Sequence, residues 1–321
     1  MTFPGRFREQ LIDGQLDHVS LSFLVDDLHI YRGGVGGNIA VGLGRLGFSS
    51  YLVGAVGADF AEYREWLETH GVDAAHVYVS DTRHTARFLC TTDADDNQIA
   101  SFYAGAMAEA GRIDLADVVR RIGTVDLVLV APNDPQAMVR HTQACRELGV
   151  PFAADPSQQL ARMDGSDIRQ LVEGAQLLFT NEYERDLMEH KTKWTRDEIL
   201  SRVGHWVTTF GAKGLEIRSA DGTSVHVGAH QDLEAADPTG VGDACRAGFL
   251  AGLQSGLGAR RSAEIGCTLA SFVLESVGTQ EYTFTAEDFA SRVARTYGAE
   301  SATDVRAFLA AHRRTDPEEN A

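Results

Sequence analysis

A glycine-rich segment in the last third of the chain carries residues that could handle phosphate. Residues 236–243 read ADPTGVGD and run directly into the helix-forming stretch ACRAGFLAGL. Gly240 and Gly242 permit backbone angles that bring consecutive N–H groups to one side, and a helix start adds the positive end of its dipole. Gly240, Val241 and Gly242 therefore form a predicted anion hole, with the carboxylate of Asp243 at its edge.

The combination favours phosphoryl transfer over a purely structural role. A carboxylate in the first turn of a helix is favourable by itself, so Asp243 alone could simply complement the helix dipole. Phosphoryl transfer needs charge stabilisation on the moving group and a base for the attacking hydroxyl. The segment supplies both within one turn, so we predict that Asp243 accepts the proton of a hydroxyl group that becomes phosphorylated.

Two further segments could hold the phosphate donor. Asn181 and Glu184 follow the apolar run QLLFT, at the carboxyl edge of a predicted parallel sheet, where ligands collect. They could form a capping box, and Glu184 could at the same time order the waters around Mg²⁺. Thr209, Gly211 and Gly214 lie in TFGAKG between two predicted strands, which is either a plain hairpin turn or the floor of a nucleotide site.

A second glycine-rich segment near the start of the chain could hold the acceptor. Residues 32–38 read RGGVGGN and precede a predicted helix at 39–46. Asn38 offers a donor and an acceptor that suit the vicinal hydroxyls of a sugar, although a glycine-rich turn capped by Asn38 is an equal alternative. Residues 42–47 match GxGxxG, but they end a helix and lead into a strand, the reverse of a dinucleotide fingerprint. We attribute those glycines to close helix–sheet packing.

Hydrophobic patterning predicts the elements that position these residues. Short apolar runs alternate with amphipathic stretches, which is typical of an α/β fold with a mostly parallel sheet flanked by helices on both faces. The predicted strands are 51–56, 125–131, 151–154 and 176–180, followed respectively by helices at 60–70, 135–148, 167–174 and 182–190. Further helices are predicted at 240–256, 260–277, 285–297 and 302–312.

Two insertions interrupt this alternation. Residues 19–31 alternate without a helical period, and residues 85–92 and 99–103 are short β-like runs joined by DADDNQ. Because a stable small sheet needs three or more strands, we expect the insertions to pair with each other or with a second subunit as one β-sheet lid. The chain is then a single domain over 1–321, with a lid at about 8–32 and 83–105, a core at 33–82 and 106–313, and a tail at 314–321.

Composition excludes several classes of protein. The net charge of −17 over 321 residues argues against nucleic-acid or anionic-membrane partners, but backbone N–H groups can still bind ATP locally. The four cysteines include no CxxC pair, and there is no apolar leader or run of eighteen apolar residues, so we expect a reduced, cytoplasmic protein. No P-loop, HExxH, GxSxG or protein-kinase motif occurs.

Taken together, GGVGGN, NEYE, TFGAKG and DPTGVGD resemble, in order and spacing, the ribokinase-like (PfkB-type) carbohydrate kinases. Within that family, FPGRF, VSLSFLVDDL, FAADPSQQLAR and LESVGTQEY are similar to actinobacterial adenosine kinases. The resemblance implies phosphorylation of the 5′-hydroxyl of adenosine by ATP, a purine-salvage reaction that needs Mg²⁺ and in some members K⁺. It also implies a homodimer in which the lids of two subunits pair.

The resemblance also implies roles for individual residues. Asp243 matches the base, and the segment from Gly240 to Gly242 matches the anion hole. Phe88 and Phe102 match aromatic groups that cover the base, which is physically reasonable because a flat purine stacks on rings, although both could be lid packing. The remaining matches on the substrate side are Ser22, Gly34, Asn38, Gln158, Gln159 and Arg162, and those on the ATP side are Asn181, Thr209, Gly211 and Gly214.

One feature of the family is missing from the chain as given. Family members open with a strand that ends in Gly and Asp, and MTFPGRF lies after that strand in relatives. We therefore expect unpaired backbone groups on its neighbours, reduced stability and poor nucleoside binding. The alternatives to an adenosine kinase are a ribose- or fructose-type sugar kinase of the same fold and a catalytically inactive nucleoside-binding protein, against which the intact Asp243 segment argues.

Overall fold

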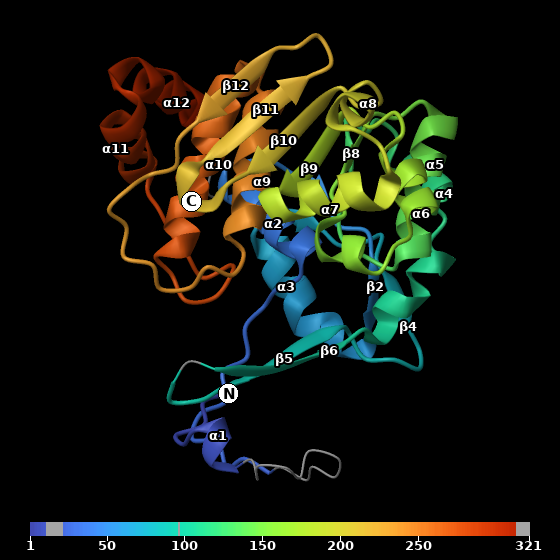
Figure 1. Ribbon diagram of the computed structural model, residues 1–321, viewed down its shortest axis with the longest axis vertical. Helices are drawn as coiled ribbons and strands as arrows, with labels where there is room; N and C mark the ends of the chain where they lie inside the picture. Colours follow the sequence, from blue (N-terminus) through green and yellow to red (C-terminus); the bar gives the residue numbers. More distant parts are fainter. Residues whose placement is uncertain (11–21, 96, 313–321) are drawn as a thin grey trace, which may run out of the picture.

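A six-stranded mixed sheet forms the centre of the protein (Figure 1). The computed structural model describes residues 1–10, 22–95 and 97–312. The strands lie in the order β12-β11-β10-β9-β8-β7, and β7 to β10 run parallel while β11 and β12 are antiparallel additions. Their bounds are β7 Val128–Val130, β8 Phe152–Ala154, β9 Leu177–Asn181, β10 His205–Thr209, β11 Leu215–Ser219 and β12 Ser224–Val227.

Helices cover both faces of this sheet because its side chains alternate between two apolar cores. On β10, Val207 joins the core beneath the helices 35–45, 241–254 and 258–274, whereas its neighbour Trp206 joins the core beneath the helices 135–148, 165–172 and 182–192. On β9, Phe179 and Leu178 divide in the same way. Strands buried on both faces explain the nearly continuous apolar runs in the sequence. The prediction of a mostly parallel α/β sheet with helices on both faces is confirmed.

The helices follow the amphipathic stretches of the sequence closely. The α-helices are α1 Phe7–Gln10, α2 Val35–Arg45, α3 Ala61–Thr69, α4 Leu115–Ile122, α5 Pro135–Leu148, α6 Gly165–Val172, α7 Glu182–Thr192, α8 Arg196–Leu200, α9 Val241–Gln254, α10 Gly258–Leu274, α11 Ala286–Tyr297 and α12 Ala299–Ala311. Short 3₁₀ turns are η1 Ala58–Phe60, η2 Gly105–Arg112, η3 Ser157–Ala161 and η4 Gly211–Lys213. None of the helices in the described ranges is long and apolar enough to span a bilayer.

The first part of the core forms two small parallel pairs outside the main sheet. They are β1 Ser50–Tyr51 with β3 Val72–Asp73, and β2 Ala55–Gly57 with β4 Tyr78–Ser80. The single strand predicted at 51–56 is therefore wrong, because the backbone turns away from one pair and joins the other. At the edge of the main sheet, no strand among the described residues pairs with the outer side of β7.

The lid contains one antiparallel ribbon, β5 Arg87–Thr92 with β6 Gln98–Tyr103, which projects from the α/β body (Figure 1). This confirms the hairpin predicted from residues 85–103. The predicted strand at 19–31 is wrong where it can be compared, because residues 22–31 contain only a bridge between Asp27 and Thr2; residues 19–21 lie outside the described ranges. The two insertions are linked through the N-terminal residues: Thr2 bridges both Asp27 and Thr92, and the backbone N–H of Phe3 donates to the carbonyl of Thr92 at 2.9 Å. The whole of the predicted tail, 314–321, also lies outside the described ranges.

Gly42, the first glycine of the GxGxxG match, serves a helix–helix contact, not the helix–sheet packing that we expected. A Cβ on Gly42 of α2 would lie 2.6 Å from the Cβ of Ala247 on α9. A Cβ on Gly44 would lie 1.8 Å from the carbonyl oxygen of His70. Gly42 lets α2 approach α9 closely, and this approach brings the first turns of the two helices together, whereas Gly44 lets α2 pack against the backbone that follows α3.

Candidate active site

The first turns of α2 and α9 meet at the centre of the site. Both helices begin at a glycine in a left-handed or related conformation, Gly34 with φ +94° and Gly240 with φ +82°, and neither glycine provides a side-chain cap. The first N–H groups of a helix have no acceptor within the helix. The predicted anion hole at Gly240, Val241 and Gly242 therefore coincides with a helix start that no side chain caps, where the N–H of Val241 makes a long contact of 3.4 Å with the carbonyl of Pro238.

Gly240 cannot be replaced by a larger residue without a local rearrangement. Its φ is in the region that glycine tolerates best, and a Cβ there would lie 2.9 Å from the Cβ of Thr279. Thr279 follows α10 in a loop that also closes over Asn38. The glycine thus allows three segments, distant in sequence, to converge on one point.

Asn38 and Asp243 are joined directly across the two helix starts. Nδ2 of Asn38 donates to Oδ2 of Asp243 at 2.7 Å. Oδ1 of Asn38 accepts from the Thr279 hydroxyl at 2.8 Å and from Nε2 of Gln280 at 2.8 Å. Because both lone pairs of Oδ1 are used, only one N–H of Asn38 remains for a ligand. Our expectation that Asn38 offers an acceptor as well as a donor to a sugar is therefore wrong.

Burial and two charged neighbours set the acidity of Asp243. Burial raises the pKa of Asp243 to about 6, while the hydrogen bond from Asn38 and the positive charge of Arg246 oppose the rise. Asp155, a second carboxylate nearby, raises it further. A carboxyl group with a pKa near neutrality can accept a proton from a hydroxyl efficiently at physiological pH.

Arg246 lies between several carboxylates beneath the site. It is 7% exposed and makes a two-pronged contact with Asp155, with Nη2 2.8 Å from Oδ1 and Nε 2.7 Å from Oδ2. Burial alone would lower the pKa of Arg246, but Asp155, Asp243 and Glu184 raise it above its ordinary value. Arg246 thus remains cationic and partly compensates the burial of these carboxylates.

The residues predicted for the ATP side also lie together. Asn181 at the end of β9 is the register partner of Thr209 at the end of β10. Oδ1 of Asn181 accepts from the N–H of Glu184, and Oε2 of Glu184 accepts from the N–H of Asn181, both at 2.8 Å, so the capping box is present. The segment from Gly211 to Gly214 contains η4 and connects the antiparallel strands β10 and β11, as the hairpin alternative predicted.

Glu184 is the acidic side chain on the ATP side of the site that we predicted to act on Mg²⁺ through water. Glu184 is 8% exposed, and burial raises its pKa against the opposing N–H of Asn181 and charge of Arg246. Oε2 of Glu184 is used in the capping box, and a hydrogen bond from the Ser157 side chain also favours the ionised form and lowers the pKa of Glu184. The described ranges contain no group of three or more His, Cys, Asp and Glu side chains placed to hold an ion. The role of Glu184 toward Mg²⁺ through water stays a prediction.

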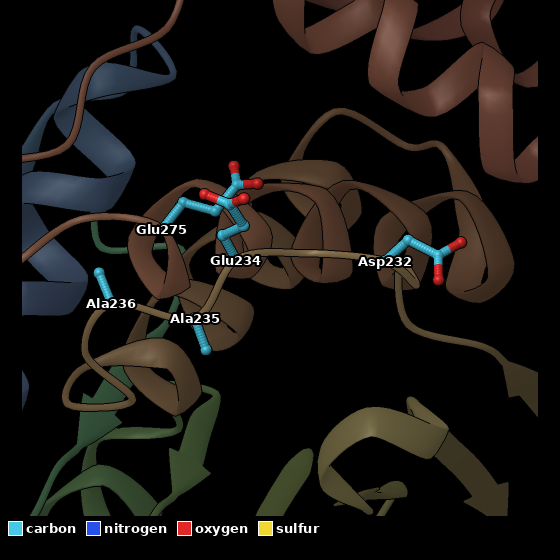
Figure 2. Close-up of a pocket in the computed structure, with 5 residues that line it drawn as sticks. All are labelled: Asp232, Glu234, Ala235, Ala236 and Glu275. Carbon is cyan, nitrogen blue, oxygen red and sulfur yellow. The ribbon is translucent and has the colours of Figure 1, made fainter.

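A cavity of about 590 Å³ lies beside the segment that leads into the site (Figure 2). Its lining residues are Asp232, Glu234, Ala235, Ala236 and Glu275. Three of these five side chains are acidic, so the cavity disfavours phosphate groups. The next residue, Asp237, instead accepts from the N–H groups of Thr239 at 2.9 Å and Gly278 at 3.2 Å and holds the loop in shape.

The residues predicted to contact the nucleoside are spread over two regions. Gln158 and Gln159 lie on η3, where Gln158 is exposed and accepts from Ser157 Oγ, and Gln159 is 4% exposed. Oε1 of Gln159 has no hydrogen-bond partner among the described residues. Arg162 is exposed just after η3, and Ser22 and Gly34 are also exposed.

Phe88 and Phe102 lie opposite each other on one face of the lid ribbon. They are 66% and 53% exposed, so they are not packed inside the lid of a single chain, as one alternative suggested. In the described part of the chain they make no ring contact with any residue of the body.

Sequence reasoning missed Arg246, Asp155, Thr279 and Gln280. A signal for Arg246 was available, because an arginine three residues after Asp243 in an otherwise apolar helix must be buried and paired. Asp155 follows the buried strand FAA, which is a comparable signal. Gln280 is fully buried, but TQEY lies in a loop and carries no periodic pattern that would reveal this.

Comparisons with known proteins identify the family of the chain. A family model described as pfkB family carbohydrate kinase matches residues 9–286. Nucleoside kinases of Methanocaldococcus jannaschii and Methanothermobacter thermautotrophicus are 29% and 33% identical to the chain, over 78% of its length and 81% and 80% of theirs. The solved nucleoside kinase of Burkholderia thailandensis in complex with inosine is 34% identical, with a TM-score of 0.81 over 93% of this chain and 94% of that one. Its complex with ADP and inosine superposes with a TM-score of 0.78 at 35% identity, over 93% and 92% of the two chains.

Proposed function

The chain belongs to the pfkB family of carbohydrate kinases, and on that premise we propose that it transfers the γ-phosphoryl group of ATP to the 5′-hydroxyl of adenosine. The kinase activity follows from the family, and the three nucleoside kinases named above align with most of the chain. The observation that carries the assignment of roles is the 2.7 Å contact between Asn38 and Asp243 where two uncapped helix starts converge.

In the proposed reaction, Asp243 takes the proton of the acceptor hydroxyl as its oxygen attacks the γ-phosphorus. The bond between that phosphorus and the bridging oxygen of ADP breaks at the same time, and ADP leaves. The uncapped amide groups at Gly240, Val241 and Gly242 stabilise the negative charge on the transferring group. Bound Mg²⁺ supplies charge neutralisation on the phosphates, and Glu184 and Asn181 border that side of the site. The dependence on K⁺ remains a prediction.

Three features of the chain support a purine nucleoside as the acceptor. Phe88 and Phe102 present exposed rings on one face of the lid, and such rings can stack on a flat base. The buried Oε1 of Gln159 has no partner in the described part of the chain and can accept from a base N–H. Adenosine is the substrate that the sequence resemblance implies. Inosine is a second candidate, because the Burkholderia thailandensis kinase binds it.

A substrate panel tests this proposal. The purified chain is mixed with ATP, Mg²⁺ and either adenosine, inosine, ribose or fructose, and ADP release is followed by a coupled assay. We expect kcat/KM to be highest for adenosine, with the product identified as the 5′-monophosphate. Turnover of ribose or fructose without turnover of any nucleoside would establish the sugar kinase alternative, and nucleoside binding without any turnover would establish the inactive binding protein.

We also propose that the lid pairs with the lid of a second copy. Leu89, Ile99 and Tyr103 share the face of the ribbon opposite to Phe88 and Phe102, and each is at least 44% exposed. A two-stranded ribbon with apolar side chains on both faces is marginal by itself. One face can cover the acceptor while the other meets a partner. Sedimentation should show a dimer that Ile99→Lys converts to a monomer, whereas a wild-type monomer at 50 μM would contradict the idea.

A further inference from the structure

A series of hydrogen bonds leads from Trp66 on α3 to Asp243, and the donor and the acceptor of each bond can be assigned in only one way. The indole Nε1 of Trp66 donates to Oε1 of Gln280 at 2.9 Å. Nε2 of Gln280 donates to Oδ1 of Asn38 at 2.8 Å, and Nδ2 of Asn38 donates to Asp243 at 2.7 Å. An indole N–H can only donate, so it fixes which end of the Gln280 amide faces Asn38.

The second proton on Nε2 of Gln280 confirms this orientation. It is donated to the hydroxyl oxygen of Tyr63 at 2.6 Å, and that hydroxyl donates its own proton to the carbonyl of Gly33 at 2.9 Å. Reversing the Gln280 amide would place two acceptors against each other at Asn38 and two donors against each other at Trp66. With Gln280 fixed, the Asn38 amide is also fixed, because its oxygen must face Gln280.

We propose that Gln280 is a positioning residue: by donating to Oδ1 of Asn38, it holds the other end of that amide as a donor to Asp243 and so favours the ionised carboxylate. Thr279 assists in the same way, but its single hydroxyl proton is shared between Asn38 at 2.8 Å and the carbonyl of Arg32 at 3.0 Å. This inference rests on the proposed role of Asp243 as the base. In that role Asp243 must be ionised to accept a proton, and Gln280 favours the ionised form.

The charges around Asp243 do not depend on Gln280. Arg246 on α9 stabilises the carboxylate, and Asp155 after β8 opposes it. Glu184 at the start of α7 acts on Arg246, while Glu281 accepts from the backbone N–H of Gln280 at 2.9 Å. A neutral substitution of Gln280 leaves all four side chains in place. Any change in the titration of Asp243 then reports the loss of the oriented amide.

The test variant is Gln280→Met, which keeps an unbranched chain of similar length but cannot donate to Asn38. The matched control is Tyr63→Phe, which removes the other acceptor of the same Gln280 amide and leaves Asn38 untouched. The protein is labelled with ¹³C-carboxyl aspartate, and the Asp243 signal is assigned by its loss in Asp243→Asn. We expect the titration midpoint of Asp243 to rise by about 1 pH unit in Gln280→Met and to stay unchanged in Tyr63→Phe.

The kinetics should change in parallel. The acid limb of the pH profile of kcat/KM for the nucleoside should move upward by the same amount in Gln280→Met, with kcat recovering above pH 8.5. A loss of activity that is equal at all pH values would indicate a structural role and overturn the proposal. So would a folded Gln280→Met variant in which the Asp243 midpoint does not move.

Thr279→Val provides a second, nearly isosteric variant if Gln280→Met does not fold. A smaller rise of the Asp243 midpoint is expected, and no rise would refute the inference. The titration is measured without turnover. If the wild type phosphorylated no nucleoside or sugar, the proposed function would fail while the hydrogen-bond chain would still be tested on its own.

Discussion

Replacing Asp243 by asparagine should remove turnover and at the same time make the protein more stable at neutral pH. Burial raises the pKa of Asp243 from its ordinary 3.8 to about 6, so the folded protein binds this proton more tightly than the unfolded chain. Stability therefore falls as the pH rises from about 4 to 6 and stays lower above that range. An amide removes the buried charge and keeps an oxygen that can accept from Asn38.

The size of the effect follows from the difference in pKa. A rise of about 2 units at about 1.4 kcal/mol per unit corresponds to about 3 kcal/mol of stability that is lost when the carboxylate ionises. The attraction to Arg246 disappears in the variant, and solvent reaches part of the carboxylate. We therefore expect Asp243→Asn to raise the free energy of unfolding by about 1–3 kcal/mol at pH 7.5. At pH 4.5, where the wild-type group is protonated in the folded state, most of this gain should vanish.

The assay is urea unfolding of both proteins at the two pH values, combined with kcat measurements at pH 7.5. Loss of the base should lower kcat by about 10²–10⁴-fold while ATP binding is retained. Asp237→Asn is a matched control on the same loop. Burial disfavours ionisation of Asp237, but hydrogen bonds from Thr239 and Gly278 outweigh it and lower the pKa. The stabilisation by these two hydrogen bonds is present above the pKa that Asp237 has in the unfolded chain, and it is lost in acid. Asp237→Asn should therefore be less stable than the wild type at pH 7.5.

Two results would refute this reasoning. A variant Asp243→Asn that is less stable than wild type at pH 7.5 would show that the carboxylate is not penalised by burial. Turnover within a factor of ten of wild type would remove Asp243 from the role of base.

Other consequences of the structure can be measured in the same way. Arg246→Met should destabilise the fold by about 3–5 kcal/mol in urea unfolding, because it leaves Asp155 buried without its cation; a loss below about 1 kcal/mol would contradict the pairing. Asn181→Ala removes the N-cap from the capping box with Glu184 and should cost about 1 kcal/mol, measured as a lower urea midpoint with an unchanged slope. Phe102→Ala should raise KM for adenosine by about tenfold while the melting temperature and the KM for ATP stay constant, whereas an equal rise in both KM values would argue against stacking on the base.

The sequence was sufficient for the features that depend on local pattern. The apolar runs and the amphipathic stretches between them indicate a parallel sheet covered on both faces, since strands that are apolar along their whole length must be buried on both faces of the sheet. The bounds of α5, Pro135–Leu148, agree with the prediction because proline and glycine mark its two ends. The capping box at Asn181 and the helix start at Gly240 were also visible, since both depend on residues within one turn.

Predictions from local sequence pattern are wrong where the backbone conformation depends on partners that are distant in sequence. The run 51–56 looks like one strand, but it joins two different neighbours and divides into β1 and β2. Residues 22–31 alternate in polarity without a strand, because only Asp27 finds a bridge partner among the described residues. The glycines at 42 and 44 were assigned to packing correctly but against the wrong element.

The sequence by itself determined the helix start and its glycines, the carboxylate in its first turn, and the match to a kinase family, because each is a property of neighbouring residues. Only the tertiary structure decided how acidic that carboxylate is. The pKa of Asp243 depends on Asn38 from the start of the chain, on Asp155 and Arg246 beneath it, and on the depth of burial. The orientation of Asn38 depends in turn on Gln280, 242 residues away in sequence. No local pattern encodes that contact, since it exists only after α2 and α9 have packed together.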